Sequence, residues 1–207
     1  MKLLDKLIDN VKFDKKYVLF SFIIVILGII TGSLFIVILN NTDKNLVIEY
    51  ITNFIDNIKN NNINNIELLK NTLITNNFII LILIIIGFSF FLFGINILIL
   101  FYKAFVIGFT LASFILTYSI KGTLLSIIYI FPHLIINILI FCLITAFTLK
   151  LSINMIKYII KKKEVNMRSY FNKYLSLILL SLFIVNLSGL YESYIMPYLF
   201  KIIIHII

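Results

Sequence analysis

The sequence contains a single cysteine, Cys142, among 207 residues. One cysteine excludes a disulfide within the chain and a metal centre built from several cysteines. Proline is almost as scarce: only Pro132 and Pro197 are present, and we expect a helix to kink, break or end near each.

Charged residues make up only 13% of the chain, whereas hydrophobic residues make up 61% and the mean hydropathy is +1.09. This composition excludes most soluble proteins and indicates a polytopic membrane protein. The net charge of +9 would suggest nucleic-acid binding in a soluble protein. Here the basic residues flank apolar segments, so we interpret them as topology signals and expect no nucleic-acid partner.

The longest apolar block runs from Phe78 to Lys150, and Lys103 and Lys121 carry its only other formal charges. A hydrocarbon layer of about 30 Å needs about 20 apolar residues per helix, so this block must contain several membrane spans. The sequence predicts an all-α fold, a polytopic helix bundle in membrane lipid that forms one domain over residues 1–207. About five transmembrane helices are expected, at 17–39, 78–100, 104–119, 123–149 and 174–195.

The basic residues are distributed unevenly around these spans. With a cytoplasmic N-terminus, 13 Lys and Arg residues fall inside, seven of them in a basic cytoplasmic loop at 150–173, and five fall outside. This asymmetry follows the known enrichment of Lys and Arg on the cytoplasmic side. The first span is longer than the apolar part of a signal peptide and no cleavage site follows, so we expect it to be retained.

The extracytoplasmic segment 40–77 is polar and rich in Asn, but its apolar residues recur at helical spacing. They are Val47, Ile51, Phe54, Ile55 and Ile58, continued by Ile66, Leu69 and Leu73. We expect one or two short amphipathic helices at the membrane surface or against the bundle. The segment either covers the bundle or offers a docking face to an extracytoplasmic partner.

Small residues recur every fourth position in two of the spans. Gly28 and Gly32 do so in the first span, and Ala104, Gly108 and Ala112 do so in the third. Small side chains let helix backbones approach closely in lipid, so each set predicts a close contact with another helix.

A polar stripe is expected on the second span, where Ser89, Asn96 and Lys103 share one face if the helix continues that far. Such a stripe either forms hydrogen bonds between helices or lines a transport path. We interpret Lys103 as a lysine whose amine reaches the cytoplasmic interface, with a buried ion-pair partner as the alternative.

Further polar residues lie where the fourth and fifth spans are interrupted. Pro132 should break the fourth span, and His133 and Asn137 follow it on one helix face. A histidine beside a broken helix is found at ion sites of transporters, although a buried structural histidine is the alternative. Glu192 should point inward or lie near the outer surface, and the fifth span ends near Pro197. Residues 198–207 either extend that span or lie in the interface.

Catalytic patterns are missing from the sequence. No phosphate-binding loop, no nucleophile with an adjacent base and no paired carboxylates in a long loop can be found. We therefore expect a protein that is not an enzyme and that has no cofactor and no metal.

Three stretches resemble the stage II sporulation protein M family. They are YKAFVIGFT at Tyr102–Thr110, the pair Pro132-His133, and Ser188–Glu192 followed by Pro197. The order of features is also similar across essentially the whole chain, from the basic N-terminus to the last span ending in Glu and Pro. Many relatives carry an acid one helical turn after the Pro-His pair, where this chain has Asn137, and this difference argues against ion handling there.

The resemblance implies a sporulation protein of endospore-forming bacteria that acts in engulfment of the forespore. It implies a multi-pass protein of the cell membrane at the sporulation septum, and a scaffold whose partners are the wall hydrolases called stage II sporulation proteins P and D. A homo-oligomer is also compatible with it. The rival hypothesis is a membrane subunit of a transporter or exporter, although the sequence shows no internal repeat that would supply a second broken helix.

Overall fold

The structure is a computed structural model that describes residues 14–60, 64–87, 93–130, 133–161 and 167–206. The described residues are almost entirely helical and contain no strand, which confirms the predicted all-α class. The helices are α2 (Lys15–Ile38), α3 (Asn41–Lys59), α4 (Asn65–Gly87), α5 (Phe93–Ile130), α6 (His133–Lys161), α7 (Met167–Leu190), the π-helix η1 (Tyr191–Ile195) and α8 (Met196–Ile206).

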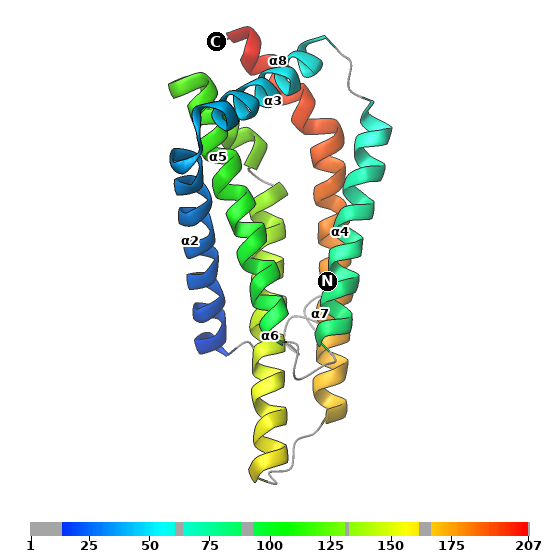
Figure 1. Ribbon diagram of the computed structural model, residues 1–207. Helices are drawn as coiled ribbons and strands as arrows, with labels where there is room; N and C mark the ends of the chain where they lie inside the picture. The colour runs from blue at the N-terminus through cyan, green and yellow to red at the C-terminus, as the bar shows by residue number, and fades with distance from the viewer. Residues whose placement is uncertain (1–13, 61–63, 88–92, 131–132, 162–166, 207) are drawn as a thin grey trace.

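Five helical stretches in the described part of the chain are long and apolar enough to cross a membrane, as predicted. They are Lys15–Ile38, Asn65–Ile86, Gly94–Ile130, His133–Lys157 and Asn172–Ile203. Figure 1 shows α2 and α5 side by side on one flank of the bundle, α4 and α7 on the other, and α3 across one end. α6 packs against α2, α5 and α7 and is the most buried span, at 61% of its most apolar stretch against 17% for α4.

The α5 helix reverses direction at Ser119, whose φ of 51° and ψ of −127° are not helical. Positive φ is uncommon for a residue with a side chain and costs about 1–3 kcal/mol, which the surrounding contacts must offset. The part after Ser119 lies against the part before it, because a Cβ on Gly122 would collide with the carbonyl of Phe114. The third predicted span therefore ends at Ser119 as expected.

The predicted boundary between the second and third spans is wrong. Residues 100–104 lie inside α5, which starts at Phe93, whereas the preceding span is α4 and starts at Asn65. The polar residues of 65–77 belong to this transmembrane helix and not to a surface segment. The apolar residues between these Asn and Thr side chains continue one helix into the membrane, where the sequence predicts a short amphipathic helix at its surface. Ser89 lies outside the described residues, so the predicted polar stripe is not described as a whole.

The predicted loop at 150–173 is also largely helical, because α6 continues to Lys161 and α7 begins at Met167. The fourth predicted span, 123–149, covers the last part of α5, which is described to Ile130, and the first part of α6, which begins at His133. Pro132, which was expected to cause the break, lies outside the described residues. The fifth span continues from α7 through η1 into α8, so helix extends well beyond the predicted end at 195.

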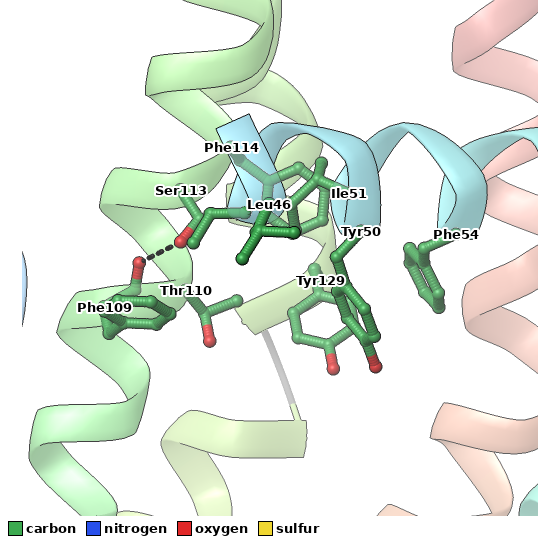
Figure 2. A pocket seen from close by; sticks show the side chains of 10 residues that line it. Leu46, Tyr50, Ile51, Phe54, Phe109, Thr110, Ser113, Phe114 and Tyr129 are labelled. Atoms are coloured by element: carbon green, nitrogen blue, oxygen red, sulfur yellow. Dashed lines mark hydrogen bonds between the residues drawn. The ribbon is translucent and has the colours of Figure 1, made fainter. Parts of the chain in front are cut away.

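Apart from the main core between the spans, a smaller apolar core closes one end of the bundle. We call this smaller core the outer-end cluster. Its buried members come from α3, α5 and α8 and are Ile51, Ile55, Ile58, Phe114, Leu125, Met196 and Phe200. Figure 2 shows α3 lying over the side chains of α5 at this end. The amphipathic helix predicted in 40–77 is thus α3, and its apolar face packs against the bundle.

Two hydrogen bonds fix α3 in this position. The Lys44 Nζ donates to the carbonyl of Val37, 3.0 Å away at the end of α2. The Thr52 and Tyr118 side chains form a hydrogen bond between α3 and α5. α3 is therefore held by side-chain contacts as well as by its apolar face.

Candidate functional site

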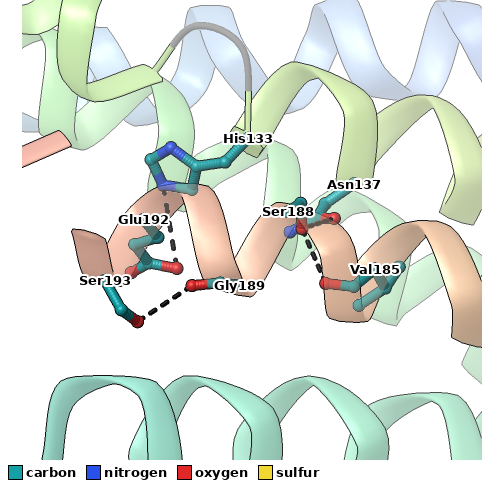
Figure 3. A network of polar contacts seen from close by, with 7 residues as sticks. All are labelled: His133, Asn137, Val185, Ser188, Gly189, Glu192 and Ser193. Atoms are coloured by element: carbon teal, nitrogen blue, oxygen red, sulfur yellow. Dashed lines mark hydrogen bonds and ion pairs between the residues drawn. The ribbon is translucent and has the colours of Figure 1, made fainter. Parts of the chain in front are cut away.

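The first residue of α6, His133, is at the centre of a polar cluster inside the bundle (Figure 3). Its side chain is 1% exposed, and neither ring nitrogen has a hydrogen-bond partner. The ring lies between two tyrosines: the Tyr129 ring is perpendicular to it with centroids 5.6 Å apart, and the Tyr191 ring is 6.2 Å away. A buried polar ring without a partner costs free energy, so its nearest charged neighbour becomes important.

That neighbour is Glu192, whose Oε2 lies 3.9 Å from Nε2 of His133. This separation is too long for a hydrogen bond but within the range of an ion pair. Glu192 lies in η1, where the widened turn lets the N–H of Met196 donate to the carbonyl of Tyr191 five residues back. Such π turns occur frequently at functional sites, because they change the direction in which side chains point.

Two more helices reach the same carboxylate. The Thr72 side chain of α4 hydrogen-bonds to Glu192, and the charge of Lys103 on α5 interacts with it. The Lys103 side chain is half-buried and lies ten residues into α5, not at a helix end. Lys103 thus lies well inside α5, within electrostatic range of Glu192. Charge pairing of this kind lowers the cost of placing an ionised group in a membrane bundle.

A second polar contact lies one helical turn along α6. The Ser188 Oγ is 2.7 Å from Oδ1 of Asn137 and 2.8 Å from the carbonyl oxygen of Val185. Because a hydroxyl has one proton for these two acceptors, it can donate to only one at a time. The Asn137 contact joins α6 to α7, whereas the Val185 contact stays within α7.

The predicted small residues form a separate contact, the α2–α5 contact, and do not belong to the polar cluster. A Cβ on Gly32 would collide with the carbonyl of Phe105, and one on Gly108 with the carbonyl of Ile29. Gly28 faces Ala104, which is fully buried. The hydroxyl of Ser33 donates to the carbonyl of Gly108 at 3.0 Å. Ala112 is half-buried on the same helix.

Pro197 is buried at the second position of α8. A proline in a helix lacks its N–H and clashes with the carbonyl four residues back, so the preceding π turn provides the extra space that it needs. The Ser193 hydroxyl donates to the carbonyl of Gly189 at 2.8 Å within this turn. Pro197 therefore lies beside the irregular turn that carries Glu192, whereas Pro132 lies outside the described residues.

The structure thus brings together Lys103, His133 and Glu192 from three helices, with Asn137 one turn away. Sequence reasoning missed Thr72, Tyr129 and Tyr191 as their neighbours, because these residues come from segments taken as surface or as plain apolar span. Within the described ranges no group of three His, Cys, Asp or Glu side chains could hold a metal ion. Chemically, the cluster can hold charge inside the bundle and couple the positions of four helices.

In a comparison with protein families, the family described as stage II sporulation protein M matches residues 20–197. No curated protein and no solved structure matches the chain significantly. The matched residues include α3, the polar cluster and all five candidate spans in whole or in large part. Because this match covers most of the chain, the protein belongs to the stage II sporulation protein M family and is a sporulation-related, multi-pass membrane protein.

Proposed function

We propose that the protein is a membrane scaffold, not an enzyme, that recruits cell-wall hydrolases to the septal membrane during engulfment. The partners would be proteins of the kind called stage II sporulation proteins P and D, and the site would be the sporulation septum and the engulfing membrane. Family membership supports the sporulation role. The observation that carries the scaffold role is α3, a helix fixed across one end of the bundle with a polar face left free.

The exposed face of α3 is suited to contact with a protein in water. Glu49, Asn53, Asp56 and Asn57 are exposed there, opposite the buried Ile51, Ile55 and Ile58. Carboxylates and amides offer hydrogen-bond acceptors and donors at fixed positions, because the apolar face and Lys44 hold the helix still. A rigid surface loses little conformational entropy on binding, which favours recognition.

The orientation expected from the Lys and Arg distribution would put this face outside the membrane. With the N-terminus in the cytoplasm, α2 crosses outward and α3 follows it, whereas the basic end of α6 lies inside. Single cysteines at Asn57 and at Lys157, in a chain with Cys142→Ala, should therefore react with an impermeant reagent from opposite sides of intact cells. Both positions are exposed.

The decisive experiment reverses charge on α3 in sporulating cells. Glu49→Lys combined with Asn53→Lys should reduce co-purification of the wall hydrolases at least several-fold while the protein stays at normal abundance. Lys157→Glu on α6 is the matched control, and it should recruit the hydrolases normally because it changes charge on the other side of the membrane. Engulfment followed with a membrane dye gives the cellular readout.

The co-purification results test the scaffold role and the α3 contact surface separately. If the wild-type protein brings down no hydrolase, the scaffold role is wrong. If it does and the α3 variant does so equally well, the scaffold role stands and α3 is not the contact.

A transporter subunit is the second candidate, because His133 and Glu192 form a polar contact inside the bundle beside the irregular turn η1. Transporters bind ions at broken helices near the middle of the membrane. This role would require Glu192 to change charge, so Glu192→Gln would abolish activity at normal abundance, and an ATPase would co-purify in place of hydrolases.

A further inference from the structure

A partly open pocket of about 350 Å³ lies beneath α3, against α5. Its size falls in the range of about 300–1,000 Å³ that is typical of small-molecule sites. The lining residues are Leu46, Val47, Tyr50, Ile51, Phe54, Phe109, Thr110, Ser113, Phe114 and Tyr129. Figure 2 shows these side chains reaching toward a shared space from α3 and from both parts of α5.

Most of the pocket lining is apolar. The hydroxyl of Thr110 donates to the carbonyl of Val106 and that of Ser113 to the carbonyl of Phe109, each at 2.8 Å within α5. No residue of the lining carries a formal charge. In Figure 2 the hydroxyls of Tyr50 and Tyr129 point the same way, away from α3. An ionic group would lose its hydration here without gaining a counter-charge, so the pocket favours hydrocarbon.

The rim is open where the membrane begins. Leu46 is 64% exposed and Tyr50 is 72% exposed, and both belong to the helix that directly follows the first span. The opposite wall belongs to the membrane-spanning part of α5. Tyrosine at such a level is typical of the membrane–water interface. The neighbouring medium at the rim is therefore the upper part of the acyl-chain region.

Van der Waals contact with the lining determines what kind of group can fill the pocket. In lipid no water is released when apolar surfaces meet, so association depends on van der Waals contact. An empty space would leave the side chains that border it without contact atoms on the pocket side. A flexible acyl chain supplies these atoms and loses no hydration when it enters.

We propose that this pocket binds one acyl chain of an outer-leaflet phospholipid, with its headgroup at the rim beside Tyr50. The bound chain would continue the outer-end cluster under α3. Lipid in this position would become part of the surface that supports α3. The inference does not depend on the proposed scaffold role.

The absence of tryptophan from the chain makes a direct test simple. Phe114→Trp places a single fluorescent reporter in the pocket wall, at a position only 1% exposed. The full-length protein is reconstituted into phosphatidylglycerol vesicles with plain or brominated acyl chains, since bromine quenches tryptophan on contact. We expect a loss of intensity close to that of Leu98→Trp, a control on the lipid-facing side of α5 at 65% exposed.

Phe141→Trp is the buried control, because Phe141 is 2% exposed in α6 and does not line the pocket. It should keep its intensity in brominated lipid. If Phe114→Trp does not fold, Phe54→Trp reports from the α3 side of the same pocket. Quenching of the pocket reporter no stronger than that of the buried control would show that no acyl chain enters, and a protein side chain would then be the occupant.

A blocking variant checks that quenching comes from the pocket itself. Thr110→Phe added to Phe114→Trp should fill the space and restore most of the intensity. Thr117→Phe is the matched control, because Thr117 lies seven residues further along α5, makes the same kind of bond to its own helix and does not line the pocket. Persistent quenching with Thr110→Phe would overturn the proposal, since the bromine would then reach the reporter by another route.

Discussion

The α2–α5 contact and the polar cluster hold the same bundle together in opposite ways. In the α2–α5 contact, Gly32 and Gly108 lie directly against backbone carbonyls, and no space remains for even one methyl group. In the polar cluster, His133 and Glu192 are 3.9 Å apart and both ring nitrogens lack a hydrogen bond. The first region is filled completely, whereas the second is polar and incompletely paired.

This difference suggests that the two regions have different roles: close packing stabilises the bundle, whereas the polar cluster specifies how its helices are arranged. Tight packing depends on shape, so any added atom disrupts it. The polar cluster depends on matching charges from separate helices, and buried charges contribute little net stability even when their pairing fixes the arrangement. We therefore expect large effects from small steric changes in the first region and partner-dependent effects in the second.

The largest effect is expected for Gly108→Leu. The new side chain would meet the backbone of Ile29, which cannot move aside as a side chain could, so the bundle should lose about 3 kcal/mol or more and much of its abundance. Gly94→Leu is the matched control, because a Cβ at Gly94 meets nothing within 4 Å. Immunoblots of membranes and thermal unfolding in detergent measure both. Equal abundance of the two variants would mean that α2 and α5 are not in close contact.

An intermediate effect is expected at the Lys103–Glu192 pair. Glu192→Gln should cost about 1–3 kcal/mol, because it leaves Lys103 without its counter-charge in the bundle. Adding Lys103→Met should recover part of this loss, since the uncompensated charge is then gone. The free energy of unfolding of the two single variants and of the double variant forms the required cycle. Strictly additive losses would show that the two charges do not interact.

The smallest effect is expected at the contact between Asn137 and Ser188. Ser188→Ala and Asn137→Ala should each cost about 0.6–2 kcal/mol, the value of a hydrogen bond between helices in a membrane. The double variant should cost little more than either single one, because both remove the same bond. A loss as large as that of Gly108→Leu in the same unfolding assay would place this contact at the centre of the fold.

The two regions also differ in how far the sequence could predict them. Glycines every fourth residue indicate a close helix contact directly, because the signal is the missing side chain itself. The partner of Lys103 could not be predicted in this way, because Glu192 lies on a distant segment and only the packing of three helices brings the two together. The same holds for Asn137 and Ser188, since their spacing along the chain carries no information about contact.

The errors in span boundaries have a related cause. The polar side chains of residues 65–77 suggest a surface segment, yet Thr72 hydrogen-bonds to Glu192 inside the bundle. Lys103 likewise separates two apolar stretches of the sequence, although it lies well inside α5. Hydropathy averages over a helix and does not show which face a polar residue occupies, so inward-facing polar residues look like ends of spans.

The reversal at Ser119 affects how the chain enters the bilayer during synthesis. The 11 residues from Ile120 to Ile130 rise by only about 16 Å as a helix, about half of the hydrocarbon thickness. This short piece cannot cross the membrane alone, and it folds back against Phe114 at the outer end. The fourth crossing therefore needs α6, and insertion of this part of the chain depends on residues that are synthesised after the reversal.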